Sequence, residues 1–173
     1  MKFAIISDTH DNLPNIKKIV NWLNKEKINL LLHCGDVCTR STIEEGFRDF
    51  KGDINISLGN ADANHDLEAG KIGNVNIVSE FGEINIDKKK IAFVHFPKEA
   101  EDLAKKNKYD LVFHGHTHKP CLARRSFGEG GGKKECLIVN PGESAGVYNK
   151  ATFATYDTGT DKLELIVIER MSS

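Results

Sequence analysis

Residues 2–36 read KFAIISDTHDNLPNIKKIVNWLNKEKINLLLHCGD, and this stretch predicts the fold class. Its apolar opening, Lys2–Ser7, is typical of a buried strand. A helix is expected to follow up to about Lys27, because Pro14 suits a first helical turn and apolar residues recur at helical spacing: Ile16, Ile19, Val20 and Leu23. Leu30–His33 is predicted to be a second buried strand. Strand, helix and strand in this order are typical of a crossover unit, in which the two strands lie parallel.

The same alternation continues through residue 60 and then changes. Ser41–Phe50 is predicted to be a helix that starts with a capping box of Ser41 and Glu44, and Asp53–Leu58 a third strand. The later pattern predicts strands joined by tight turns at 75–79, 83–86 and 90–95, a helix at 98–106, a strand at 111–114, and hairpins at 122–140 and 151–169. The glycines of 128–132 predict a mobile tip for the first hairpin. We therefore expect one α/β domain over residues 1–173, with two mixed sheets facing each other and helices outside.

The composition narrows the function classes. The chain has 24 Lys and Arg residues against 25 Asp and Glu residues, a balance that argues against a surface built for nucleic acid or another polyanion. No apolar run approaches the ~20 residues needed to cross a bilayer, and the first residues resemble a strand rather than a signal peptide. The four cysteines are too few for a disulfide scaffold and are expected to be reduced. These features predict a soluble, cytoplasmic protein with no membrane partner.

Polar side chains that can bind a metal follow nearly every predicted strand. They are Asp8, His10, Asp36, Asn60, His95, His116 and His118. Because sites in open α/β sheets form beyond the carboxyl ends of the strands, these side chains are expected to meet in one crevice. Asp8 and His10 are two residues apart, and so are His116 and His118. In an extended chain, residues two apart lie on the same face, so the members of each pair can point to one ion. A donor set of Asp, Asn and His without Cys suits Mn²⁺, Fe²⁺, Ni²⁺ or Zn²⁺.

The most specific of these patterns is Gly115-His116-Thr117-His118, since chance would produce G-H-x-H far less than once in a chain of this composition. The full set resembles the signature blocks of the calcineurin-like metallophosphoesterase superfamily, in order: Asp8-Thr9-His10, Gly35-Asp36, Gly59-Asn60, His95 and the G-H-T-H block. Asn140-Pro141-Gly142 also resembles a turn of the small, single-domain phosphodiesterase branch of that superfamily.

The resemblance implies a fold, a cofactor and an activity. The fold would be a four-layer α/β/β/α sandwich, in agreement with the pattern of elements. Of two divalent ions, one would be held by Asp8, His10 and His118 and the other by Asn60, His95 and His116, with Asp36 bridging both. Mn²⁺ is the first expectation, and Ni²⁺, Fe²⁺, Zn²⁺ and Co²⁺ are alternatives. The activity would be phosphodiester hydrolysis, in which a metal-bridging hydroxide held at Asp36 attacks phosphorus in line.

Two positions depart from the superfamily pattern. Larger members carry His directly after G-N, where it is thought to protonate the leaving group or hold the phosphate, but this chain has Ala61. In the N-P-G turn, Glu143 stands where the branch usually has Ser. His65, five residues after Asn60, is the remaining candidate for a catalytic proton donor, weighed against an ordinary role as a loop residue.

Four other polar residues near the motifs are expected to have structural roles. His33 and His114 are expected to be hydrogen-bonded residues on the other face of their strands. Asp11 and Asn12 are expected to serve the start of a helix rather than to bind a metal.

The formal charges favour a diester substrate. Two divalent ions with Asp8, Asp36 and a hydroxide leave about one positive charge, which a diester monoanion neutralises and a monoester dianion exceeds. We therefore expect a small phosphodiester as substrate, with nucleic acid bound only as a small nucleotide. Three alternatives stay open: a phosphomonoesterase using the same site, a non-catalytic protein-binding module of the same fold, and a nuclease, which is disfavoured because the chain lacks a basic groove-forming segment. Association of the chain with copies of itself also stays open.

Overall fold

The computed structural model describes the chain except for residues 63–66, 68–71, 129–133 and 172–173. The described strands form two sheets. The first has the strand order β11-β10-β1-β2-β3-β4, with the bounds Lys162–Val167, Thr152–Asp157, Lys2–Ile6, Leu30–His33, Asp53–Ser57 and Val75–Val78. The second has the order β5-β6-β7-β9-β8, with the bounds Gly82–Ile86, Lys89–Phe93, Leu111–Phe113, Lys134–Asn140 and Cys121–Phe127. The helices are α1 (Leu13–Lys25), α2 (Arg40–Gly46) and α3 (Pro97–Lys105), with short 3-10 turns η1 (Asn60–Asp62) and η3 (Ile168–Arg170).

Both sheets mix parallel and antiparallel strands. In the first sheet β1 to β4 run parallel, whereas β10 is antiparallel to β1 and β11 to β10. In the second sheet β6, β7 and β9 run parallel, and β5 and β8 are antiparallel to their neighbours. Parallel neighbours end at the same edge of a sheet. The segments that follow β1, β2 and β3 therefore emerge together, as do those that follow β6 and β7.

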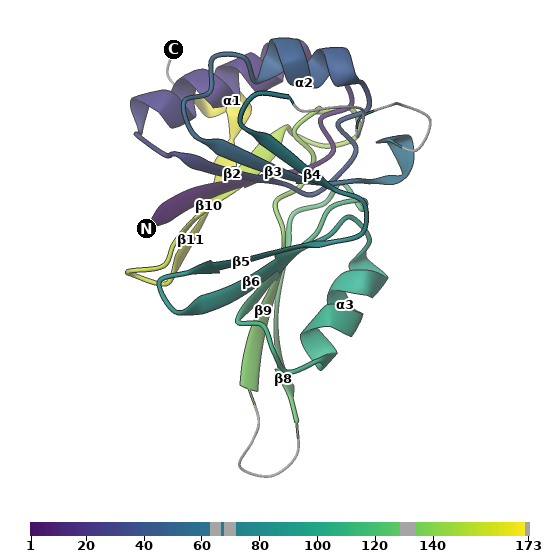
Figure 1. The fold of residues 1–173 in the computed structure, drawn as a ribbon, viewed down its shortest axis with the longest axis vertical. Coiled ribbons are helices and arrows are strands. Elements are labelled where there is room, and N and C mark those ends of the chain that lie inside the picture. Colours follow the sequence, from purple (N-terminus) through teal and green to yellow (C-terminus); the bar gives the residue numbers. More distant parts are fainter. Residues whose placement is uncertain (63–66, 68–71, 129–133, 172–173) are drawn as a thin grey trace.

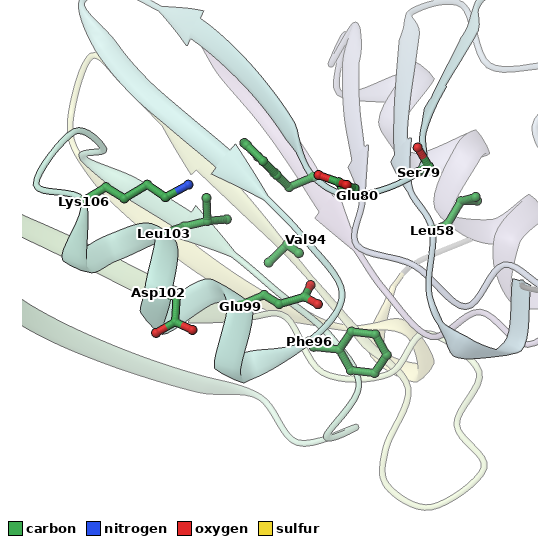
Figure 2. A pocket seen from close by; sticks show the side chains of 10 residues that line it. Leu58, Ser79, Glu80, Val94, Phe96, Glu99, Asp102, Leu103 and Lys106 are labelled. Atoms are coloured by element: carbon green, nitrogen blue, oxygen red, sulfur yellow. The ribbon is translucent and has the colours of Figure 1, made fainter.

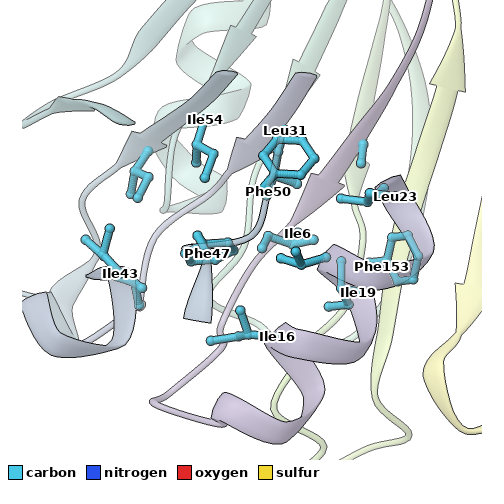
Figure 3. Packing of buried hydrophobic residues seen from close by; sticks show 14 of the residues in the cluster. Ile6, Ile16, Ile19, Leu23, Leu31, Ile43, Phe47, Phe50, Ile54 and Phe153 are labelled. Carbon is cyan, nitrogen blue, oxygen red and sulfur yellow. The ribbon is translucent and has the colours of Figure 1, made fainter. Parts of the chain in front are cut away.

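The sheets and helices form four layers (Figure 1). α1 and α2 cover the outer face of the first sheet, where Ile16, Ile19 and Leu23 face Ile6 and Phe153 (Figure 3). The two sheets pack face to face through a second apolar cluster, and α3 covers the second sheet through a third. The observed α/β/β/α order confirms the predicted fold class.

The ends of α1 follow from local sequence. Asn12 is its N-cap, and the side-chain oxygen accepts a hydrogen bond from the backbone N–H of Asn15 at 3.1 Å. Pro14 lies in the first turn, where its missing N–H costs nothing. The prediction of Asn12 as a helix-start residue is confirmed.

The start of α2 differs from the prediction. The N-cap is Thr39, whose hydroxyl accepts a hydrogen bond from the backbone N–H of Thr42 at 3.3 Å, so the capping box of Ser41 and Glu44 is wrong. Thr39 is fixed by Asp11, whose carboxylate accepts hydrogen bonds from its backbone N–H at 3.1 Å and its hydroxyl at 2.8 Å. Asp11 thus serves the start of α2, a contact between distant residues that a local pattern does not contain.

The placement of β4 also differs from the prediction. The sequence suggests successive strands joined by tight turns from residue 75 onward, but β4 pairs in parallel with β3 and belongs to the first sheet. β5 and β6 then form a hairpin in the second sheet. The side chains of β4 explain this, because Ile77 packs in the helix layer and Val78 packs between the sheets. A strand that is apolar on both faces fits a sheet covered on both sides.

The remaining elements lie close to their predicted positions. β8 and β9 form one hairpin and β10 and β11 another, as predicted. The predicted mobile tip at 128–132 lies, apart from Gly128, outside the described residues. Among the helices of the described part of the chain, none is long and apolar enough to span a membrane.

Candidate metal centre

The structure brings the seven sequence-predicted donor residues together at one end of the sandwich. Five strands deliver them: Asp8 and His10 follow β1, Asp36 follows β2, Asn60 follows β3, His95 follows β6, and His116 and His118 follow β7. The two sheets therefore contribute to one cluster, and the cluster lies at the edge where their parallel strands end.

Four of these residues form a first group of donors: Asp8, His10, Asp36 and His118. One ligand atom from each can be chosen so that all four atoms lie within 4.8 Å of one another. The Nε2 atom of His118 lies 3.4 Å from Asp8 Oδ1 and 3.4 Å from His10 Nε2. Atoms that bind one ion at about 2.1 Å are themselves about 3.0–3.4 Å apart, so this group fits a divalent cation.

A second group of donors lies on the other side of Asp36. Asn60 Oδ1 is 3.1 Å from His95 Nε2 and 3.0 Å from His116 Nδ1, and the two ring nitrogens are 3.3 Å apart. His95 Nε2 is also 3.5 Å from Asp36 Oδ2, an oxygen that lies 3.8 Å from His10 Nε2. One carboxylate oxygen thus faces histidines of both groups.

Contacts outside the donor groups reach two of the histidines: a hydrogen bond to His95 and a close carboxylate beside His118. His95 Nδ1 lies 2.8 Å from the backbone carbonyl of Cys34. Because a carbonyl only accepts hydrogen bonds, Nδ1 carries the proton and Nε2 presents a lone pair to the second group. His118 Nδ1 lies 3.4 Å from the Glu143 carboxylate, while its Nε2 faces the first group. Such outer partners orient histidine ligands in metal sites.

Glu143 is a site residue whose role sequence reasoning missed, since it stood out only as a departure from the N-P-G turn. It is fully buried, and its carboxylate accepts hydrogen bonds from the backbone N–H groups of Val147 and Tyr148, both at 2.8 Å, and from that of Asn149. Burial alone would raise the pKa of Glu143, but these N–H donors outweigh it and hold the pKa below its usual value. The sequence did contain a signal for this role, because Glu143 places a carboxylate where the N-P-G turn usually continues with Ser.

Asp62 is a second residue that was missed. It is 1% exposed and accepts hydrogen bonds from the backbone N–H groups of Asp36 at 2.9 Å, Cys38 at 2.7 Å and Gly59 at 2.7 Å. It therefore ties the loop after β2 to the loop after β3, and so fixes the two donor-bearing loops relative to each other. Nothing in the sequence separates this aspartate from an ordinary loop residue.

The buried carboxylates carry an electrostatic cost that a cation offsets. Burial raises the pKa of Asp8 to about 7, against a lowering by the Ser7 side chain and by His118. Asp36 is 2% exposed and accepts a hydrogen bond from the backbone N–H of Ala61 at 2.8 Å. Buried acids are tolerated when they are paired or bind a metal.

The backbone of the cluster is strained. Five of the seven donor residues have positive φ: 52° at Asp8, 40° at His10, 59° at Asp36, 69° at His116 and 60° at His118. This left-handed region costs a residue other than glycine about 1–2 kcal/mol. Such strain persists where the surrounding structure requires it and gathers at functional sites. Here all five strained residues lie in the loops that carry the two donor groups.

Steric crowding explains why the G-N and G-H motifs contain glycine. A methyl group on Gly59 would collide with the Asp36 carboxylate and the His95 ring, and one on Gly115 would collide with the Ser7 hydroxyl and Asp8. The G-N and G-H dipeptides are therefore required by close approach of the donor-bearing loops.

The other histidines lie outside the donor groups or outside the described residues. His33 is fully buried with Nε2 at 2.9 Å from the Thr9 hydroxyl, and His114 is 4% exposed with Nδ1 at 3.1 Å from the carbonyl of Gly115. Both are hydrogen-bonded as predicted. His65, the candidate proton donor, lies outside the described residues.

Two aromatic rings border the donor groups. The ring of Phe96 lies 4.9 Å, centroid to centroid, from those of both His95 and His116. The ring of Tyr148 lies 5.1 Å from that of His118 and is 77% exposed. One aromatic ring therefore lies beside each donor group, Tyr148 at the first and Phe96 at the second.

Comparison with known proteins agrees with this geometry. The family model of the calcineurin-like phosphoesterase superfamily domain matches residues 1–161. The chain belongs to this superfamily. Superfamily membership and the donor cluster together make it a metal-dependent phosphoester hydrolase.

Individual relatives span the chain. A phosphodiesterase of Methanocaldococcus jannaschii is 34% identical over 175 residues, which cover 98% of this chain and 100% of the relative. A solved archaeal phosphodiesterase has 30% identity and a TM-score of 0.77, covering 96% of this chain and 99% of the other. Vps29 of Entamoeba histolytica, solved with Zn²⁺, has 22% identity and a TM-score of 0.62 over 97% of this chain and 99% of the other, a similarity that shows the fold alone.

Proposed function

We propose that this protein is a phosphodiesterase that binds two divalent ions and hydrolyses small phosphate diesters by in-line attack of a hydroxide bridging the ions. The curated phosphodiesterase of Methanocaldococcus jannaschii, at 34% identity, and the solved structure of an archaeal phosphodiesterase, at 30% identity, support the reaction class. In such sites the ions lower the pKa of the bound water and withdraw charge from the phosphate oxygens. For the ions themselves we propose Mn²⁺ first, with Ni²⁺, Fe²⁺, Zn²⁺ and Co²⁺ as alternatives.

The observation that carries the proposal is the position of Asp36. Its Oδ2 atom lies 3.8 Å from a nitrogen of the first group, in His10, and 3.5 Å from a nitrogen of the second group, in His95. A single ion does not reach seven donors that approach from two sides of one carboxylate. We therefore assign Asp36 as the bridge, the first group to one ion and the second group to the other.

The protein residues have separate tasks in this reaction. Asp36 keeps the two ions at a fixed separation, and Asp62 holds the Asp36 loop through its backbone N–H. Asn60 adds a neutral oxygen, so the second ion keeps more of its charge for the substrate than it would beside a third carboxylate. The protonated Nδ1 of His95 keeps Nε2 available as a ligand.

The same charges support a diester substrate. Asp8 and Asp36 are the two carboxylates among the seven donors, which leaves the loaded centre about one positive charge with the hydroxide included. Ala61 supplies no proton to a leaving group, so substrates with good leaving groups should react faster. Monoester hydrolysis is the second candidate, because both reactions use the same metal chemistry.

Metal content and substrate preference test the proposal together. After reconstitution with Mn²⁺, elemental analysis should find two ions per chain, and the Asn60→Ala variant should retain fewer. Asn85→Ala is the matched control, because Asn85 is exposed on β5. Bis(p-nitrophenyl) phosphate should be hydrolysed faster than p-nitrophenyl phosphate, and a chelator should abolish both activities. One ion at saturating metal, activity that survives the chelator, or faster hydrolysis of the monoester would each contradict the proposal.

A further inference from the structure

A cavity of about 420 Å³ lies beside the donor groups. Its walls come from the helix α3, from the segment between β4 and β5, and from the residue that follows β3 (Figure 2). Ten residues line it: Leu58, Ser79, Glu80, Phe81, Val94, Phe96, Glu99, Asp102, Leu103 and Lys106. Its volume lies within the range of about 300–1,000 Å³ that is common for small-molecule sites.

The cavity adjoins the donor groups through shared residues. Phe96 lines the cavity, and its ring lies 4.9 Å from the rings of both His95 and His116. Leu58 directly precedes Gly59-Asn60, and Val94 directly precedes His95. The ring of Phe96 thus contacts the second donor group and also forms part of the cavity wall.

The lining combines an apolar surface with acidic side chains. Leu58, Phe81, Val94, Phe96 and Leu103 supply aromatic and aliphatic surface. Glu80, Glu99 and Asp102 face the cavity from its exposed walls, and among the described lining residues one lysine, Lys106, stands against them.

Lys106, the one lysine among the lining residues that the structure describes, is already engaged. The ammonium group of Lys106 lies 5.3 Å from the centroid of the Phe81 ring, and Asp102 accepts a hydrogen bond from Lys105 at 2.9 Å. Within the described part of the chain, no hydrogen bond or ion pair engages the side-chain carboxylate of Glu80 or Glu99. An anionic group in the cavity would be repelled by these two carboxylates, whereas an uncharged apolar group would bury surface against the rings.

We propose that this cavity is a specificity subsite that binds an uncharged, apolar substituent of the diester, an aryl or alkyl group, and rejects a substituent that carries a second negative charge. The inference rests on the proposed function, because the metal centre must hold the phosphate. It predicts that this enzyme prefers diesters of apolar alcohols to diesters that carry an additional phosphate or carboxylate.

Filling the cavity tests its role in binding. Calorimetric titration of the Mn²⁺-loaded protein should show diphenyl phosphate binding at least about tenfold more tightly than dimethyl phosphate, because a buried phenyl ring contributes that much or more. Ser79 is exposed at the cavity wall, so Ser79→Trp can fill the space without disturbing the core. This variant should lose the preference for the phenyl ester. Ser126→Trp, at an exposed position on β8, is the matched control and should keep it.

Charge reversal tests the rejection of anions. The wild type should bind diphenyl phosphate more tightly than bis(4-carboxyphenyl) phosphate, and Glu80→Lys should narrow the difference at least about threefold. Glu45→Lys, at an exposed position on α2, makes the same change of net charge away from the cavity and should leave the difference unchanged.

The outcomes separate this subsite from the proposed function. If bis(p-nitrophenyl) phosphate is hydrolysed but diphenyl phosphate binds no better than dimethyl phosphate, or Ser79→Trp keeps the preference, the subsite is refuted and the phosphodiesterase stands. An equal effect of Glu80→Lys and Glu45→Lys would refute the rejection of anions by the cavity. If the loaded protein neither binds these phosphates nor hydrolyses bis(p-nitrophenyl) phosphate, the proposed function itself fails.

Discussion

The buried histidine His33 should make the protein lose stability in mild acid. His33 is fully buried, with Nε2 at 2.9 Å from the Thr9 hydroxyl, beside the donor-bearing loop that follows β1. Burial, together with smaller contributions from the neighbouring His95 and His10, lowers the pKa of His33 from 6.5 to about 3. The native state therefore keeps His33 neutral at a pH where the unfolded chain binds a proton.

The sign and size of the effect follow from these two pKa values. Between pH 6.5 and about 3 the unfolded state binds more protons than the native state, so stability falls as the pH is lowered through this window. Each pH unit in the window costs about 1.4 kcal/mol, so lowering the pH from 7.5 to 5 should remove about 2 kcal/mol through His33 alone. For a protein of marginal stability this is a large fraction of the free energy of unfolding.

Urea unfolding of the metal-free protein at pH 7.5 and pH 5 measures this loss. His33→Gln should lower the free energy of unfolding at pH 7.5 but should lose about 2 kcal/mol less than the wild type on acidification. Ile43→Ala is the control, because Ile43 is a buried core residue with no titratable group, and it should lose as much on acidification as the wild type. If the His33→Gln protein loses as much stability between the two pH values as the wild type, the argument from the buried neutral histidine is refuted.

Four further predictions concern the metal centre. Asp36→Ala should reduce activity more than Asn60→Ala, because Asp36 faces both donor groups; near-normal turnover of Asp36→Ala with two ions bound would remove the bridge assignment. Glu143→Gln should weaken metal binding about 10- to 100-fold by releasing His118, measured by metal titration, and unchanged affinity would contradict an orienting role. Saturation with Mn²⁺ at about 100 times its dissociation constant should raise the free energy of unfolding by about 2.7 kcal/mol, and equal stability with and without metal would show that the strained cluster binds no ion. Diesters of alkyl alcohols should react about 10²- to 10⁴-fold more slowly than nitrophenyl diesters, since Ala61 donates no proton, and equal rates across a leaving-group series would contradict this.

Local pattern was enough to place most of the elements. The apolar periodicity of α1, the apolar runs of β1 and β2 and the turn residues of the two hairpins are local signals, and the structure follows them closely. The seven donor residues were also visible, because each follows a strand and parallel strands end at a common edge. Their spacing in the chain, in particular in the G-H-T-H block, identifies them as candidate donors without the tertiary structure.

Features that depend on contacts between residues far apart in the chain could not be predicted from local sequence patterns. Thr39 rather than Ser41 starts α2 because Asp11, 28 residues away, holds it. β4 joined the first sheet because its side chains find apolar partners on both faces, which no window of sequence contains.

The sequence by itself determined the α/β class, the order of its elements and which side chains are candidate metal donors, because periodicity and residue chemistry are written along the chain. Only the tertiary structure decided that Glu143 lies against His118, that Asp62 ties the donor-bearing loops together, and that a cavity opens beside Phe96. The reason is physical: the Glu143 carboxylate lies 3.4 Å from a ring nitrogen of His118, a residue 25 positions earlier in the chain. Such a distance is set by how β7 and the loop after β9 pack in the folded protein, and residue order does not specify it.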